Sequence, residues 1–212
     1  LMDLIKPLPK FDRVSVGFPG MVREGHILSA PHFVSPSGPG GKPKQQLVDS
    51  WQRFNLQAAM SKATGKPTKV ANDADIQGAA VVQGQGFEAV VTLGTGVGTA
   101  FFFQGQLLPH FELAHHPLRK DLTYNEVLGD EARKRAGHKK WERRVLEMIE
   151  TLRSLTFFDH CFLGGGNAAR LDVELPHDVS VVSNEAGILG GIRLWEATRS
   201  AHPTPPPTAP GT

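Results

Sequence analysis

The apolar positions of the chain follow two patterns, short continuous runs and stripes at helical spacing. The runs are rich in β-branched residues, and turn residues bound most of them, which is typical of buried strands. The sequence predicts strands at residues 14–18, 68–71, 89–93, 98–103, 158–163 and 179–182. The third and fourth runs are separated by the glycine-rich segment Gly94–Val97 and therefore predict a β-hairpin.

Stripes at helical spacing alternate with these strands, which predicts an α/β fold. We expect helices at residues 56–64, 76–83, 124–155 and 185–195, the first ending at Gly65 and the third broken near Gly137. The end of the third helix carries a core-facing stripe of Trp141, Val145, Met148, Ile149, Leu152 and Leu155. Residues 35–44, rich in proline and glycine, predict a surface loop, and the Pro/Thr tail beyond residue 197 predicts disorder.

Composition narrows the class of protein. Of 212 residues, 40% are hydrophobic and 21% charged, which predicts a globular core and rules out collagen, coiled coil and wholesale disorder. No apolar stretch approaches the ~18–20 residues that span a bilayer. The net charge of +2 by itself gives no reason to expect nucleic-acid binding. The single cysteine, Cys161, excludes an internal disulfide and a Cys-rich zinc cluster, and its apolar surroundings predict a buried packing residue.

The chain begins at Leu1 without the basic and apolar regions of a secretory signal. We therefore expect a partial sequence that lacks a first segment, from a cytoplasmic protein.

Polar or glycine-rich clusters follow four of the predicted strands. They are Pro19-Gly20, Asn72-Asp73, Gly94–Gly98 and Gly164–Asn167. A single cluster of this kind is more often only a turn. Because strand ends collect ligands in α/β proteins, four such clusters predict one shared cleft.

Gly94–Gly98 has neither the strand-to-helix context of a dinucleotide fingerprint nor the lysine of a Walker loop. A glycine-rich hairpin tip can instead turn several backbone N–H groups into one concavity, where the Thr95 and Thr99 hydroxyls add donors. This predicts a site for a phosphate in transfer between two substrates.

Asn72-Asp73 places a carboxylate and an amide together at a strand end. The carboxylate could accept the proton of an attacking hydroxyl while the amide holds another hydroxyl, which is a general-base arrangement. The alternative is that Asp73 or Asp75 caps the following helix.

Glu112 and His115 lie three residues apart, a spacing that lets both converge on a small polyol. Alternatively, His110, His115 and His116 are surface residues or ligands of an all-His/carboxylate metal site. The basic stretch from Arg133 to Arg144 is either a solvated helix face or an anion-binding patch.

Taken in order, these clusters resemble the ROK family of sugar kinases, most closely its bacterial polyphosphate/ATP-glucokinase-like members. The matching segments are 16–20, 72–75, 92–99, 112–115, 163–168 and 184–187. The resemblance implies an actin/hexokinase-like fold of two ribonuclease-H-like lobes with an incomplete first lobe. Residues 1–88 would be the remainder of the N-terminal lobe, 89–198 the C-terminal lobe with a closing helix, and 199–212 a disordered tail.

The resemblance also implies roles for individual residues. Asp73 would be the catalytic base. The sugar ligands would be Gly20, Asn72, Glu112, His115 and Glu126, and the phosphate and nucleotide ligands Gly94, Thr95, Gly96, Gly98, Gly164, Gly165 and Gly166. The expected reaction moves a phosphoryl group from ATP or polyphosphate, with Mg²⁺, to the 6-hydroxyl of a hexose, glucose foremost. A homodimer is expected, with no nucleic-acid or membrane partner.

Two departures from the family pattern change these expectations. The Asp-containing, glycine-rich phosphate hairpin at the family's N-terminus is missing, so this chain alone is expected to bind the donor poorly or to be inactive. The family's Cys-rich zinc motif is also missing, and Ala114 replaces a glycine, so no metal site is predicted. The alternative function is a non-catalytic, sugar-binding regulator, although Asp73 favours the kinase.

Overall fold

The structure is a computed structural model that describes residues 5, 7, 9–37, 41–183 and 187–196. A five-stranded mixed sheet occupies its centre, in the order β11-β10-β5-β6-β7. The strands are β5 (Phe87–Leu93), β6 (Val97–Phe103), β7 (Gln106–Leu107), β10 (His160–Gly164) and β11 (Val179–Val181). Strand β10 runs parallel to β5 and β11, whereas β5, β6 and β7 form an antiparallel meander.

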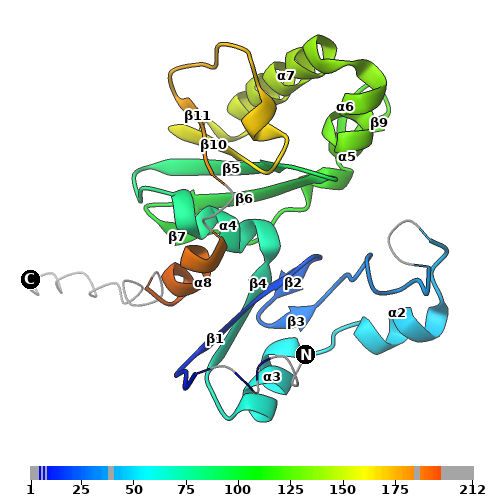
Figure 1. The fold of residues 1–212 in the computed structure, drawn as a ribbon, viewed down its shortest axis with the longest axis vertical. Helices are drawn as coiled ribbons and strands as arrows, with labels where there is room; N and C mark the ends of the chain where they lie inside the picture. The colour runs from blue at the N-terminus through cyan, green and yellow to red at the C-terminus, as the bar shows by residue number, and fades with distance from the viewer. Residues whose placement is uncertain (1–4, 6, 8, 38–40, 184–186, 197–212) are drawn as a thin grey trace, which may run out of the picture.

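Two different groups of helices cover the two faces of this sheet (Figure 1). On one face, Val91, Phe101 and Leu163 pack in a large core with α5 (Tyr124–Leu128) and α7 (His138–Thr156). The short helix α6 (Asp130–Ala136) connects these two helices. On the other face, Val90, Phe102 and Phe162 pack against α4 (Asp73–Val81). Both faces are covered, which is why the strands read as continuous apolar runs.

A second, smaller sheet pairs β1 (Val14–Phe18) with β4 (Thr68–Asn72) in parallel. Around it lie β2 (Val22–Arg23), β3 (His26–Ile27), α2 (Gln45–Trp51) and α3 (Leu56–Thr64). Phe18, Ile27 and Val70 form a separate small core here. Between β7 and α5 the chain adds η1 (Leu113–His115), β8 (Pro117–Arg119) and β9 (Leu122–Thr123), and η2 (Ala168–Arg170) follows β10.

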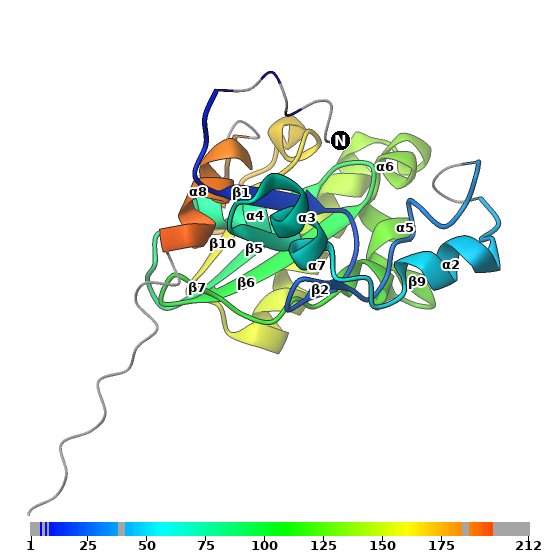
Figure 2. The same ribbon diagram turned by 90° about the horizontal axis from the view of Figure 1, so that it is seen from below.

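The helix α8 (Gly187–Glu196) returns from the end of the chain to lie beside α4 and β1 (Figure 1, Figure 2). Gly190 lets the two helices approach closely, because a Cβ atom there would stand 1.7 Å from the Ile76 carbonyl oxygen. Trp195 anchors the other end of α8. Its Nε1–H donates to the Ser15 hydroxyl at 2.9 Å, and Lys69 lies over its ring.

Most predicted elements are confirmed, although several strand ends differ by one or two residues, as in β5 and β10, and two predicted helices have wrong bounds. Leu155, expected in the core-facing stripe, is exposed. Strand β1 and helix α3 have the predicted bounds, and Gly65 ends α3 with a φ of 65°. Helix α4 begins at Asp73 and not at residue 76, because Asn72 caps it. The predicted helix 124–155 is three helices, interrupted at Gly129 as well as Gly137.

The remaining expectations concern the core, the lobes and the chain ends. Cys161 is buried as predicted, and burial raises the pKa of its thiol to about 12. Packing of α8 on β1 and α4 fits a closing helix, while the lobe boundary at residue 88 stays a prediction. Residues 184–186 and the tail beyond 196 lie outside the described residues. Within the described residues, no helix is long and apolar enough to span a membrane.

Candidate active site

The junction of β4 and α4 is built around Asn72. This buried side chain is the N-cap of α4, where its Oδ1 accepts the Ala74 N–H at 2.8 Å. Its Nδ2 donates to the Gly20 carbonyl oxygen at 3.0 Å and so ties the turn after β1 to the end of β4. The N-cap is thus Asn72, and the aspartates share in the capping from the first turn, where Asp73 Oδ1 also accepts the Ala74 N–H at 3.0 Å and Asp75 accepts the Asn72 N–H. Two predicted site residues, Gly20 and Asn72, lie in direct contact.

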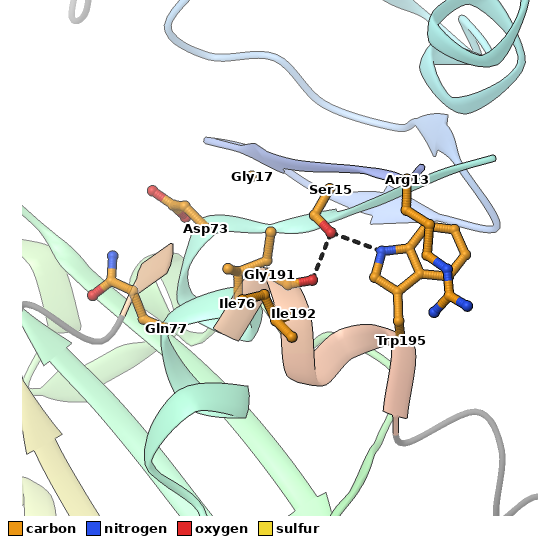
Figure 3. A pocket seen from close by; sticks show the side chains of 9 residues that line it. All are labelled: Arg13, Ser15, Gly17, Asp73, Ile76, Gln77, Gly191, Ile192 and Trp195. Atoms are coloured by element: carbon orange, nitrogen blue, oxygen red, sulfur yellow. Dashed lines mark hydrogen bonds between the residues drawn. The ribbon is translucent and has the colours of Figure 1, made fainter. Parts of the chain in front are cut away.

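Asp73, the first residue of α4, stands at one end of a cavity of about 630 Å³ between β1, α4 and α8. Figure 3 shows its carboxylate at the end of the cavity opposite Trp195, with Gly17 and Gln77 nearby. Burial raises the pKa of Asp73, and the neighbouring Glu112 carboxylate adds to the rise. A raised pKa makes this carboxylate a better proton acceptor.

The β5–β6 hairpin presents its tip near the start of α4. The Val97 N–H donates to Asn125 Oδ1 at 2.7 Å, which holds the tip in place. In the part of the chain that the structure describes, the N–H groups of Thr95 and Gly96 donate no hydrogen bond. Gly98 lies against Ala74, since a Cβ atom there would stand 2.8 Å from the Ala74 Cβ. Glycine at 98 thus lets the hairpin approach the helix that begins with Asp73.

The glycine-rich loop after β10 is fixed to the same hairpin. Asn167 donates its backbone N–H to the Leu93 carbonyl oxygen at 2.9 Å and its Nδ2 to the Gly94 carbonyl oxygen at 3.0 Å. Gly165 lies against the Leu93 backbone. The predicted phosphate and nucleotide segments, Gly94–Gly98 and Gly164–Gly166, are therefore neighbours.

Glu112 and His115 lie in the irregular segment between β7 and α5, which Thr99 anchors by donating its hydroxyl to the Phe111 carbonyl oxygen at 2.9 Å. Glu112 is close enough to Asp73 and to His115 to interact electrostatically with each. The structure thus brings the predicted base and two predicted sugar ligands together, with the His115 side chain exposed.

Two residues near this site were not predicted to act in it. His110 is buried, and its Nδ1 lies 2.9 Å from Asp75 Oδ1, while its Nε2 lies 3.8 Å from Glu112 Oε2. Burial alone would lower the pKa of His110, but the Asp75 and Glu112 carboxylates outweigh it and raise that pKa to about 9. His32 lies beside the Pro19 turn, with its Nδ1 3.3 Å from the Pro19 carbonyl oxygen. Its electrostatic interaction with Asp73 acts to lower the pKa of that carboxylate.

Glu126 has a different surrounding. It is exposed, and its Oε2 accepts the Thr123 backbone N–H at 2.9 Å and the Thr123 hydroxyl at 2.8 Å, which completes a capping box at the start of α5. The structure gives Glu126 this capping role, and contact with a sugar stays a prediction. Among the described residues, no three His, Cys, Asp or Glu side chains gather as a metal site would require.

Comparison with known proteins gives a consistent result, although no family model matches the chain. The polyphosphate glucokinase of Mycobacterium leprae (strain TN) is 24% identical over 201 residues, covering 84% of this chain and 55% of that protein. The polyphosphate glucokinase of Mycobacterium tuberculosis (strain ATCC 25618 / H37Rv) is 26% identical over 201 residues, covering 84% and 67%.

Solved structures show the same likeness. The inorganic polyphosphate/ATP-glucomannokinase from Arthrobacter sp. strain KM superposes with a TM-score of 0.71 at 26% identity, over 94% of this chain and 79% of that one. The ROK family glucokinase from Streptomyces griseus, in complex with glucose and AMPPNP, gives 0.60 at 16% identity, over 90% and 82%. The latter likeness concerns the fold alone.

The likeness shows that the chain has the actin/hexokinase-like fold of the ROK sugar kinases, as the sequence motifs predicted. Within that class, the chain is a relative of the polyphosphate glucokinases. It spans 55% of the length of the M. leprae relative and 67% of the M. tuberculosis relative.

Proposed function

We propose that this chain is the sugar- and phosphate-binding part of a hexose kinase, which transfers a phosphoryl group from ATP or polyphosphate to the 6-hydroxyl of a hexose, with glucose the first candidate. One observation carries the proposal: Asp73, a carboxylate with a raised pKa, interacts electrostatically with Glu112 and begins the helix against which the glycine hairpin packs at Gly98. A base between a polyol site and a phosphate site is what phosphoryl transfer to a hydroxyl requires.

In the proposed reaction, the sugar hydroxyl lies against Asp73, and Glu112 and His115 accept or donate hydrogen bonds to its other hydroxyls. The hydroxyl oxygen attacks the terminal phosphorus of the donor. A new O–P bond forms, the bond to the leaving phosphate oxygen breaks, and the hydroxyl proton passes to Asp73. The raised pKa of Asp73 favours this last step.

The donor would lie along the β5–β6 hairpin. The N–H groups of Thr95 and Gly96 are available to its phosphate oxygens, and the loop Gly164–Gly166 adjoins the same hairpin. Mg²⁺ usually keeps several waters and takes its remaining ligands from one or two carboxylates and the substrate's phosphates. A metal that arrives with the donor needs no prebuilt cluster of ligands, which agrees with the finding for the described residues, and it would neutralise the phosphate charge.

Polyphosphate is the donor that a second observation favours. The N–H of Asp130, at the start of α6, donates to the Gly94 carbonyl oxygen at 3.0 Å, so the basic helix α6 begins beside the proposed phosphate site, and the basic first turns of α7 follow it in the chain. Lys139, Lys140 and Arg143 are exposed, and none of them forms an ion pair within the described ranges. Both the curated relatives and the Arthrobacter structure carry polyphosphate in their names.

Titration calorimetry with glucose, mannose and a non-hexose polyol tests the sugar site first. A coupled assay for the sugar phosphate, with ATP and with polyphosphate as separate donors, then tests the transfer. Binding of a hexose with turnover supports the kinase. Binding without turnover on either donor, in the full-length protein that includes the expected first segment, would instead favour a sugar-sensing regulator, a function that the fold permits because a ROK family transcriptional regulator also superposes, with a TM-score of 0.59.

A further inference from the structure

His110 is a buried charged side chain that the proposed phosphoryl transfer does not use. Only 3% of its side chain is exposed, and its one hydrogen bond among the described residues joins Nδ1 to the Asp75 carboxylate at 2.9 Å. Its other ring nitrogen, Nε2, is buried without a hydrogen-bond partner in the part of the chain that the structure describes. A buried N–H without a partner is costly, so this atom calls for an explanation.

The acceptor that Nε2 faces is Glu112 Oε2, at 3.8 Å, beyond hydrogen-bonding distance but within the range of an ion pair. The Glu112 side chain is 27% exposed and lies in an irregular segment, where the Ala114 backbone also acts on its carboxylate. Asp75 is different, because it belongs to the first turn of α4 and is almost completely buried. His110 therefore lies between a buried anchor, Asp75, and a partly exposed carboxylate, Glu112.

We propose that His110 is a positioning residue: anchored through Nδ1 on Asp75, it presents Nε2–H to the Glu112 carboxylate and fixes that carboxylate for sugar binding. The His110 Nε2 and Glu112 Oε2 atoms are 3.8 Å apart, so an approach of less than 1 Å would let them form a hydrogen bond. The inference rests on the proposed function, in which Glu112 binds the sugar.

The charges around His110 support this arrangement. From α4 it faces Asp75, with Asp73 farther along the same helix end, and from its own segment it faces Glu112, with His115 beyond. Three carboxylates thus lie close together. A positive imidazolium among them reduces their mutual repulsion and lets Glu112 stay ionised beside Asp73. The pKa of about 9 keeps His110 charged at neutral pH, and the pKa of Glu112 is lowered accordingly.

Calorimetry with glucose tests the role of His110 in this chain. His110→Gln keeps a hydrogen-bonding side chain but loses the charge, and His116→Gln, an exposed histidine of the same segment, is the matched control. We expect His110→Gln to weaken glucose binding about ten- to a hundredfold, the usual range for loss of a hydrogen bond to a charged group. In a Glu112→Gln background the same change should have little further effect, because the partner is already gone.

The pH dependence separates positioning from a purely structural role. We expect the wild type to bind glucose more weakly above pH 9, where His110 loses its proton. Glucose carries no charge, so this pH dependence cannot come from the ligand. The His110→Gln variant should lack this dependence, and His116→Gln should keep it. If His110→Gln fails to fold, the double variant Asp75→Asn/His110→Gln replaces it, since it leaves no unpaired buried carboxylate.

Three results would overturn the inference. In the first, a folded Asp75→Asn/His110→Gln variant binds glucose as the wild type does at every pH. In the second, the losses from His110→Gln and Glu112→Gln simply add. In the third, Glu112→Gln leaves the His110 ring titration, followed by ¹⁵N NMR, unchanged. The last measurement needs no sugar, so it still decides the role of His110 if the wild type binds no hexose, which would refute the proposed function instead.

Discussion

The Nδ1 atom of His110 lies 2.9 Å from the Oδ1 atom of Asp75, and both side chains are almost completely buried. The two residues are 35 positions apart, one on the segment after β7 and the other in the first turn of α4. Because Asp73 begins the same helix and Glu112 follows His110 by two residues, this pair joins the proposed base and the proposed sugar ligands into one unit.

The pair predicts a pH dependence of stability. The pKa of His110 is about 9 in the folded protein, above its ordinary value of 6.5, so the folded state binds this proton more tightly than the unfolded state. The stabilisation is fully present below pH 6.5, decreases from there to pH 9, and is absent above pH 9. The loss is on the order of a few kcal/mol at most.

Urea unfolding at a series of pH values measures this contribution. The free energy of unfolding of the wild type should fall between pH 6.5 and 9 more steeply than that of His110→Gln. His116→Gln should follow the wild type. Parallel curves for the wild type and His110→Gln would show that His110 does not hold its proton through this pair.

The proposed base gives a kinetic prediction. In the full-length protein, Asp73→Asn should lower kcat by on the order of 10²–10⁴, because an amide can still hydrogen-bond to the sugar hydroxyl but cannot take its proton. The affinity for the sugar should change much less. Steady-state kinetics with saturating hexose checks the kcat, with the exposed Asp121→Asn as the control. A turnover equal to that of the wild type would refute Asp73 as the base.

Glu112 gives a prediction for sugar binding. Glu112→Ala removes a charged hydrogen-bond acceptor from the proposed polyol site, which should weaken binding by ~1–3 kcal/mol. Calorimetry with glucose measures the change, and Glu174→Ala, an exposed glutamate on a remote loop, is the control. If Glu112→Ala binds glucose as tightly as the wild type, the sugar lies elsewhere.

Close packing of α8 on α4 predicts that alanine replacements of two adjacent glycines, Gly190 and Gly191, lower the free energy of unfolding by very different amounts. In Gly190→Ala the new methyl group would stand 1.7 Å from the Ile76 carbonyl oxygen, so the helices must separate. Overpacking of this kind costs about 1–3 kcal/mol or more of unfolding free energy. In Gly191→Ala the nearest atom is the Ser15 Cβ at 3.3 Å, which asks for only a small adjustment. Equal melting temperatures for the two variants would show that α8 does not pack in this way.

Much of the fold could be predicted from the sequence, because its main strands are continuous apolar runs that turn residues bound. The run Val14–Phe18 stops at Pro19-Gly20, and the structure has β1 with those bounds. The start of α4 was misplaced because its first turn holds polar capping residues and carries no apolar periodicity. The two-residue strands β2, β3, β7 and β9 were missed because so few residues form no recognisable pattern.

The site was predictable where it depends on strand ends and unpredictable where it depends on contacts distant in the sequence. The clusters after β5 and β10 meet because those strands are parallel neighbours, and Asn167 joins them. The clusters after β1 and β4 meet for the same reason, and Asn72 joins them. The pairing of His110 with Asp75 depends on where the segment after β7 crosses the start of α4. No local spacing encodes that crossing, so His110 could only be considered as a surface or metal-ligating residue.

The basic residues of α6 and α7 lead to the last prediction. In the structure, Arg133 and Lys134 pair with Asp130, at 2.8 Å in each case, so their charges are already compensated. Lys139, Lys140 and Arg143 are exposed and without ion pairs in the ranges that the structure describes. A polyphosphate chain carries about one charge per phosphate, so it can reach cations beyond the nucleotide site, whereas ATP cannot.

Replacing Lys139, Lys140 and Arg143 together by glutamine should therefore lower kcat/KM for polyphosphate selectively. The loss should be largest at low ionic strength, because salt screens interactions between exposed charges over a Debye length of about 10 Å at 0.1 M. Lys44, Lys62 and Lys66, which lie around the smaller sheet and far from α7 in the sequence, provide a control triple replacement with the same change in net charge. Coupled assays with both donors at two salt concentrations make the comparison. Equal losses with ATP and polyphosphate, or none with either, would show that this row is an ordinary solvated helix face.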